Sequence, residues 1–161
     1  MTLRIVVTGG TFDKRYDELK GELTFKDSHL PLILKAARVT LPVEVEVTEL
    51  KDSLYMTDAD RRRVLDACRT AFERQIVVVH GTDTMVQTAH LIGAASLDKT
   101  IVLTGAMVPF SVYGSDSLFN LGFAVAAAQT LAPGVFVSMN GRIFDWDRVR
   151  KNTDQGIFEA I

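Results

Sequence analysis

The sequence lacks the features of several large classes of protein. It has a single cysteine in 161 residues, so it cannot form an internal disulfide and is not a small cross-linked fold. It has no apolar run long enough to span a bilayer, and Arg4 interrupts the short apolar stretch at the N-terminus, so neither a transmembrane helix nor a signal peptide is expected. The formal net charge is only -2, which predicts no binding to nucleic acid or to an anionic membrane. These absences fit a cytoplasmic enzyme best.

Metal-binding and nucleotide-binding patterns are also missing. The histidines His29, His80 and His90 form no metal-ligand spacing with any pair of acidic residues. The glycine turn at 8–11 follows a strand-like run but lacks the third glycine and the distant acidic residue of a dinucleotide fingerprint. We therefore expect neither a metal nor an organic cofactor.

What is present is the alternating pattern of an α/β protein. The length and the 47% hydrophobic content suit one globular domain over residues 1–161. Strand-like and helix-like segments alternate, which predicts a doubly wound, mostly parallel sheet with helices on both faces. Strands are expected at 4–8, 43–47, 75–79, 100–103 and 135–138, and helices at 28–39, 57–74, 84–96 and 116–131. The polar stretch 12–27 is expected to be a loop or a small hairpin, 142–144 a short hairpin strand, and the chain after Asp145 a polar tail.

Some residues that attract notice are expected to be structural. Cys68 lies on an apolar helix face with no histidine near it in sequence, and free cysteines are usually buried. His80 ends an apolar strand, so a packed and hydrogen-bonded histidine is expected there. His90 lies within a helix and is assigned a structural role as well.

Two short loops, each carrying threonines, leave apolar strands. The first is Thr8–Thr11 and the second is His80–Thr84. Because the carboxyl ends of parallel strands share one edge of a sheet, the hydroxyls and the Asp83 carboxylate should converge there. A threonine beside a group that accepts its proton can attack an amide. The simpler alternatives are a tight glycine turn in the first loop and a helix cap in the second.

Two further residues lie in loops that could reach the same edge. Ser53 follows the second strand, where it is either part of a loop leading into a helix cap or a ligand for a carboxylate. Lys151 lies in a basic segment, and composition alone favours a solvated lysine. Only if the chain folds back to Thr82 and Asp83 could Lys151 accept a proton from a threonine.

Together these residues resemble the bacterial-type L-asparaginase family, which includes glutaminase-asparaginases. Thr8–Thr11 is similar to the first signature of the family, and His80–Met85 with Thr88-Ala89 is similar to the second. The following block is matched by Thr104–Met107, Ser115-Asp116 and Phe119–Leu121. The resemblance covers nearly the whole chain and implies a short, single-domain form without the carboxy-terminal domain of the two-domain enzymes.

The resemblance also implies catalytic roles, position by position. Thr11 would be the nucleophile that becomes acylated, and Tyr16, in a mobile loop, would support it. Thr82, Asp83 and Lys151 would form a second triad that activates a hydroxyl or a water molecule.

Substrate contacts follow from the same resemblance. Ser53 would bind the α-carboxylate of the substrate, and Asp83 would bind the α-ammonium group, with Thr82 also counted among the substrate-binding residues. The backbone of Ala106 would lie near the side-chain amide, and Gly10 would belong to the same set of contacts.

Three positions depart from the family pattern. Leu54 stands where a glutamine commonly follows the serine, and Val108 stands where an arginine follows the Ala-Met pair. The spacing around Lys151 is shortened, which leaves Arg150 as an alternative base. Lys151 is preferred because arginine is effectively never deprotonated.

The expected function is hydrolysis of L-asparagine to L-aspartate and ammonia, through a threonine nucleophile and an acyl-enzyme. The alternatives are a non-catalytic module that senses asparagine or aspartate, an inactive truncated domain, and an amidotransferase subunit acting on a tRNA-linked amino acid. The nearly neutral charge disfavours the last. A homo-oligomer, dimer or higher, is expected because the pocket lacks a wall, and the preference between asparagine and glutamine stays open.

Overall fold

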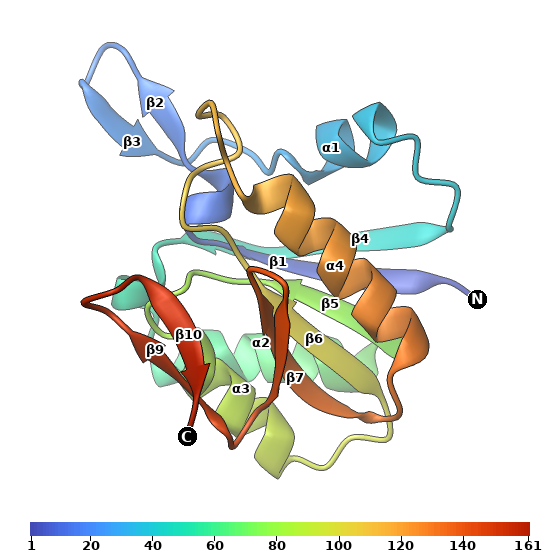
Figure 1. The fold of residues 1–161 in the computed structure, drawn as a ribbon. Helices are drawn as coiled ribbons and strands as arrows, with labels where there is room; N and C mark the ends of the chain where they lie inside the picture. The colour runs from blue at the N-terminus through green and yellow to red at the C-terminus, as the bar shows by residue number, and fades with distance from the viewer.

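The computed structural model describes residues 1–161 and contains a six-stranded sheet with helices on both faces (Figure 1). The strand order is β4-β1-β5-β6-β7-β8; the first five strands are parallel and β8 is antiparallel at the edge. The predicted α/β class and the short hairpin that follows the last parallel strand are confirmed. The bounds of the strands are β1 (Leu3–Gly9), β4 (Val43–Lys51), β5 (Gln75–Val79), β6 (Thr100–Thr104), β7 (Gly134–Met139) and β8 (Arg142–Asp145).

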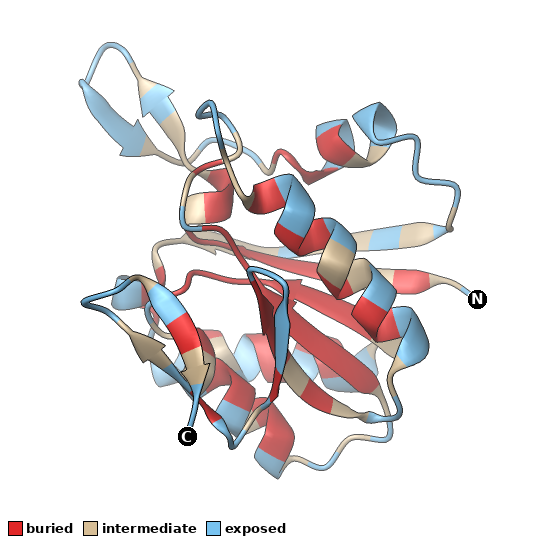
Figure 2. Ribbon diagram, viewed as in Figure 1, coloured by how far each residue is buried: buried red, intermediate tan, exposed pale blue.

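The central strands are mostly apolar because both of their faces are buried (Figure 2). In β5, Ile76 and Val78 pack with α2 (Asp58–Thr70) and α3 (Met85–Ala94). The alternate residues Val77 and Val79 pack with α1 (Leu30–Ala36) and α4 (Ser117–Thr130) on the other face. Two hydrophobic cores therefore lie on the two sides of one sheet.

The sheet topology reverses direction between β1 and β5. The chain leaves β1 to form β4 on one side and later returns to form β5 on the other. In open α/β sheets, ligands bind outside the carboxyl ends of the strands at such a switch point. The loops that leave β1 and β5 carry Thr11 and Thr82, so the topology brings both predicted threonines to this point.

The predicted helices are present, with shorter ends. Thr57 and Asp60 form a capping box at the start of α2: the Thr57 hydroxyl accepts from the Asp60 N–H at 3.2 Å, and the Asp60 carboxylate accepts from the Thr57 N–H at 2.7 Å. This helix ends at Thr70 rather than near 74. Cys68 is buried on α2, as predicted, and burial raises the pKa of its thiol to about 12. None of the helices combines the length and the apolar composition needed to cross a membrane.

Two polar segments have more structure than a loop and a tail. After a 3-10 turn at Thr11–Asp13, β2 (Arg15–Asp17) and β3 (Glu22–Thr24) form a hairpin that projects from the body (Figure 1). The small-hairpin alternative for this stretch is therefore confirmed.

The expected polar tail after Asp145 is wrong. β9 (Val149–Asn152) and β10 (Ile157–Ala160) form an antiparallel hairpin, and its Val149 and Phe158 are buried in the core beside α3. The approach to this hairpin is fixed by Trp146, which packs so closely on α3 that a Cβ added to Gly93 would lie 2.2 Å from the indole ring.

Candidate active site

Three loops meet at the carboxyl edge of the sheet: the first threonine loop, the second threonine loop and the loop that carries Ser53. Glycines in the two threonine loops make the contacts possible. A Cβ on Gly10 would lie 2.4 Å from the Cα of Gly81, and a Cβ on Gly81 would lie 2.6 Å from the Oγ of Ser53. Gly10 also has a φ of +70°, a conformation that residues with a Cβ rarely adopt. The glycines therefore allow the approach that brings Thr11, Thr82 and Ser53 into one cluster.

A fourth loop joins this cluster from β6. A Cβ on Gly105 would lie 2.3 Å from the carbonyl oxygen of His80, so this loop also packs directly on the second threonine loop. The next residue is Ala106, which is almost completely buried. The structure thus brings Gly10, Ser53, Thr82 and Ala106 to one place.

Lys151 completes the second threonine loop. Its Nζ donates to the Thr82 Oγ at 2.8 Å and to the Asp83 Oδ1 at 2.6 Å. Arg150, the neighbour on β9, instead pairs with Glu159 at 2.8 Å. The β9–β10 hairpin, which the sequence did not predict, is the element that folds Lys151 back onto Thr82.

Ser53 is tied to the start of α3. Its Oγ accepts from the Thr84 N–H at 3.2 Å, and the Thr84 hydroxyl donates to the Ser53 carbonyl at 2.9 Å. The N-cap residue of α3 is Thr84, and its side chain makes no capping bond. The helix-cap alternative for Thr82 and Asp83 is therefore not realised: an acceptor for this helix end comes from another loop.

An ion pair that the sequence did not reveal joins the Thr11 loop to the Ser53 loop. The Lys14 Nζ donates to the Asp52 carboxylate at 2.6 Å, and Asp52 also accepts from the Leu54 N–H. Burial alone would raise the pKa of Asp52, but Lys14 and the Leu54 N–H outweigh burial and hold this pKa below its ordinary value. Charged residues in predicted loops look solvated, so no pattern indicated this pair.

His80 is fully buried, as predicted for a structural histidine. Its Nδ1 lies 2.7 Å from the Gly81 carbonyl, so Nδ1 is the donor, and Nε2 accepts from the Thr88 hydroxyl at 2.8 Å. Burial lowers the pKa of His80 to about 4, so the ring is neutral at pH 7. His80 therefore supports the loop from beneath. The other predicted structural histidine, His90, lies on α3, and its ring is edge-on to the ring of Trp146.

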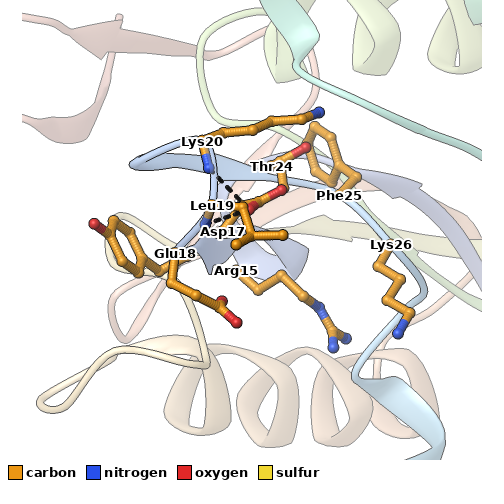
Figure 3. A pocket seen from close by; sticks show the side chains of 9 residues that line it. Arg15, Asp17, Glu18, Leu19, Lys20, Thr24, Phe25 and Lys26 are labelled. Carbon is orange, nitrogen blue, oxygen red and sulfur yellow. Dashed lines mark hydrogen bonds between the residues drawn. The ribbon is translucent and has the colours of Figure 1, made fainter.

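Tyr16 is not brought into the cluster. It lies on the projecting hairpin with 62% of its surface exposed, and its hydroxyl is 4.0 Å from the Cβ position of Gly21 in the same hairpin. Figure 3 shows the hollow that the hairpin forms by itself, with Asp17 accepting from the N–H groups of Leu19 and Lys20. This hollow is separate from the four-loop cluster.

The cluster offers chemistry based on hydroxyls, an ammonium and a carboxylate. A threonine hydroxyl bonded to a lysine amine can pass on or receive a proton, and a neighbouring carboxylate stabilises the ammonium form. No three His, Cys, Asp or Glu side chains lie close enough together to hold a metal ion. The arrangement suits nucleophilic attack and proton transfer.

Comparison with known proteins identifies relatives over the whole chain. The sequence profile of the family described as "Asparaginase, N-terminal" matches residues 2–159. L-asparaginase 2 of Escherichia coli (strain K12) is 33% identical over 125 residues, which cover 74% of this chain and 35% of that protein. The solved structure of the thermostable L-asparaginase from Thermococcus kodakarensis has a TM-score of 0.84 and 27% identity, covering 100% of this chain and 51% of the other. A probable cytoplasmic L-asparaginase from Campylobacter jejuni has a TM-score of 0.85 and 29% identity, covering 98% and 52%.

The similarity covers nearly the whole of this chain but only part of its relatives. The chain spans about half the length of these two solved structures, and the matched half is the part that the family profile describes as N-terminal. This is also the half that contains the four-loop cluster. The chain therefore belongs to the asparaginase family.

Proposed function

We propose that the chain is an L-asparagine amidohydrolase that hydrolyses L-asparagine to L-aspartate and ammonia. The observation that carries this proposal is the contact of Lys151 with Thr82 and Asp83. This contact lies next to the Gly10–Gly81 junction that the Thr11 loop enters. In this position Lys151 can exchange a proton with Thr82, the second threonine of the site.

In the proposed reaction, the Thr11 Oγ attacks the side-chain amide carbon of the substrate. The hydroxyl proton passes by way of Thr82 and Lys151 to the leaving nitrogen, the C–N bond breaks, and ammonia departs. Water then attacks the threonyl ester, a proton returns to the Thr11 Oγ as the ester C–O bond breaks, and aspartate is released. Backbone N–H groups of the loops would stabilise the oxyanion, a contribution of roughly 3 kcal/mol per donor in known enzymes.

The binding roles implied by the resemblance are supported by the hydrogen-bonding groups that the loops leave free. The Ser53 Oγ accepts from the Thr84 N–H, so its own hydrogen stays available to donate to the substrate α-carboxylate. Asp83, which is partly exposed beside Lys151, would bind the α-ammonium group. The backbone of Gly10 and Ala106 would line the amide end. Tyr16 would support Thr11 only when the hairpin folds over the cluster.

The first test is ammonia release from L-asparagine, with L-glutamine measured in parallel. We expect release by the unsubstituted chain and none by Thr11→Ala, with both proteins folded as judged by circular dichroism. Turnover retained in Thr11→Ala would refute the nucleophile. A folded parent that releases no ammonia, yet is thermally stabilised by aspartate, would favour the alternative of a non-catalytic sensor.

The setting of the reaction is part of the proposal. We expect a homo-oligomer, dimer or higher, because the cluster lies at an open edge of the sheet, and we expect a cytoplasmic location like that described for the Campylobacter jejuni relative. Size-exclusion chromatography with light scattering measures the first. A monomer with full activity would show that the site needs no second copy.

A further inference from the structure

Asp116 stands at the start of α4 but does not cap it. It is the N-cap residue, with helical backbone angles and no side-chain capping bond. Its Oδ1 instead accepts from the backbone N–H groups of Met107 and Val108, each at 3.0 Å. The carboxylate is therefore bonded to the loop that carries Ala106.

Two asparagines complete a network around this carboxylate. The Asn120 Nδ2 donates to the Asp116 Oδ2 and to the Gly105 carbonyl, both at 2.9 Å. The Asn140 Nδ2 donates to the same Asp116 oxygen at 3.0 Å, and the Asn140 N–H donates to the Asn120 Oδ1 at 3.0 Å. The carboxylate thus accepts from four groups on three segments of the chain.

The network fixes both peptide groups that flank Ala106. Asn120 holds the carbonyl of Gly105 before it, and Asp116 holds the N–H of Met107 after it. With both neighbours fixed, the directions of the Ala106 N–H and carbonyl are fixed as well. Burial alone would raise the pKa of Asp116, but bonds from Asn140, Val108 and Met107 lower it, so the carboxylate stays ionised at neutral pH.

Asn140 links the Ala106 loop to the chain segment that leads to the β9–β10 hairpin, on which Lys151 lies. It has a φ of +48° and forms, with Gly141, the turn between β7 and β8. β8 then leads past Trp146 to β9, on which Lys151 lies. One carboxylate therefore connects the Ala106 loop to the chain segment that positions the proposed base.

We propose that Asp116 is a positioning residue for the amide-cleaving step: it holds the Ala106 backbone at the leaving nitrogen and keeps the β7–β8 turn in register with it. The inference rests on the proposed function. Asp116 itself would not contact the substrate. Its loss should therefore affect steps that use the Ala106 carbonyl more than steps that do not.

The test uses two substrates that differ in the leaving group. L-Asparagine leaves a nitrogen whose hydrogens the Ala106 carbonyl can accept, whereas the β-methyl ester of L-aspartate leaves an oxygen without them. Asp116→Asn keeps the size and the acceptor for the Met107 N–H but places an amide NH₂ opposite the donors of Asn120 and Asn140. Both substrates form the same acyl-enzyme, so the comparison is made on kcat/KM, which reports the acylation step. We expect kcat/KM for the amide to fall about tenfold more than kcat/KM for the ester, the effect of losing about one hydrogen bond to a charged group. Asp98→Asn, an exposed aspartate paired with Arg74, is the matched control.

A second variant and a second readout keep the test decisive. Asn140→Gly preserves the left-handed turn while removing the donor to Asp116, and it should shift the amide-to-ester ratio in the same direction by a smaller factor. Hydrogen exchange at the Met107 and Val108 amides should become faster in Asp116→Asn, because the remaining amide oxygen is a weaker acceptor than the carboxylate. Equal losses on amide and ester, or unchanged exchange at these amides, would overturn the proposal. If the unsubstituted chain hydrolyses neither substrate, the proposed function fails, and the exchange measurement alone then decides whether Asp116 holds the loop.

Discussion

Thr11 and Thr82 lie on loops that touch, yet their hydroxyls are held differently. Thr82 is only 6% exposed and its Oγ accepts from Lys151 at 2.8 Å. Thr11 is half-buried at the start of a 3-10 turn, and none of the hydrogen bonds that hold the cluster involves its hydroxyl. The hydroxyl of Thr82, the proposed proton-transfer threonine, is therefore already hydrogen-bonded in this structure, whereas the hydroxyl of Thr11, the proposed nucleophile, is not.

The difference follows from what each loop leads into. The second loop connects β5, buried on both faces, to α3, which packs in the same core. The first loop leads into the β2–β3 hairpin, where Leu19 and Leu23 are exposed and no core is formed. Loops that change conformation come from the less stable parts of a structure. Thr11 itself is anchored by its neighbours, since Gly10 packs on Gly81 and Phe12 is fully buried, so the mobile part of this loop begins beyond Phe12. The comparison therefore separates a proposed base that is already hydrogen-bonded from a proposed nucleophile whose hydroxyl is free of such bonds.

The largest expected effect on activity comes from removing the Lys151 amine, which is hydrogen-bonded to Thr82. Lys151→Met should lower kcat for L-asparagine by about 10²–10⁴, the usual contribution of a proton-transfer group. Arg150→Met removes a neighbouring cation that pairs with Glu159 instead, and it should leave kcat within a few-fold. Equal losses in the two variants, both folded, would show that Lys151 has no special role.

Separating the two loops should cost most in stability. Gly10→Ala places a methyl group 2.4 Å from the Gly81 Cα at a φ of +70°, and we expect a loss of about 3 kcal/mol or more in the free energy of unfolding. Gly114→Ala is the matched control, because Gly114 has a φ of +78° but open space around it, and it should cost about 1 kcal/mol. Urea unfolding measures both. Similar losses would mean that strain, and not the loop contact, explains Gly10.

Lowering the pH should reduce the free energy of unfolding, because protonation of the buried His80 ring destabilises the second loop. The folded chain keeps this ring neutral down to a pKa of about 4, whereas the unfolded chain takes up the proton near 6.5. Stability is therefore full above 6.5 and falls as the pH drops toward 4, by about 3 kcal/mol at most. Urea unfolding at several pH values should show this slope in the parent and in the control His90→Gln. The slope should become smaller in His80→Asn but not vanish, because burial also lowers the pKa of His29, and that histidine contributes in the same direction.

The smallest expected effect on stability concerns the ion pair between the first loop and the Ser53 loop. Lys14→Met removes the 2.6 Å ion pair with Asp52 that ties this loop to the Ser53 turn. We expect a loss of about 1 kcal/mol or less in the free energy of unfolding, because the pair remains partly accessible to water. Lys20→Met, at an exposed position in the hairpin, is the comparison. A loss of several kcal/mol would show that the first loop is held as firmly as the second.

The sequence predicted the parts of the site that follow central strands. Apolar runs such as Ile76–Val79 indicate buried strands, and parallel strands direct their loops to one edge, so the meeting of the two threonine loops could be expected. The β9–β10 hairpin could not, because Val149, the buried residue of β9, stands alone between charged residues, and its pairing with the short apolar run at Ile157-Phe158 is a tertiary contact. The contact of Trp146 with Gly93 joins residues far apart in sequence, and no local pattern reveals it.

The same limit applies to the residues around Ala106. Ser115-Asp116 and Asn120 could be noticed as part of a motif, but nothing local showed that an aspartate at a helix start bonds backward to a loop. The Asn140-Gly141 pair is a recognisable turn signal, though its link to Asp116 is not. Tyr16 was grouped with the site by resemblance, and its place on a projecting hairpin depends on tertiary structure.

The central claim is that Thr11 attacks the substrate while Thr82 handles its proton, and the acyl-enzyme tests this claim most directly. The unsubstituted chain would be mixed with L-asparagine, quenched in acid during turnover, digested, and examined by mass spectrometry for an aspartyl ester. We predict that the ester lies on the peptide containing Thr11 and is absent from the peptide containing Thr82. An ester on Thr82, or continued turnover with acyl groups on neither threonine, would contradict the account.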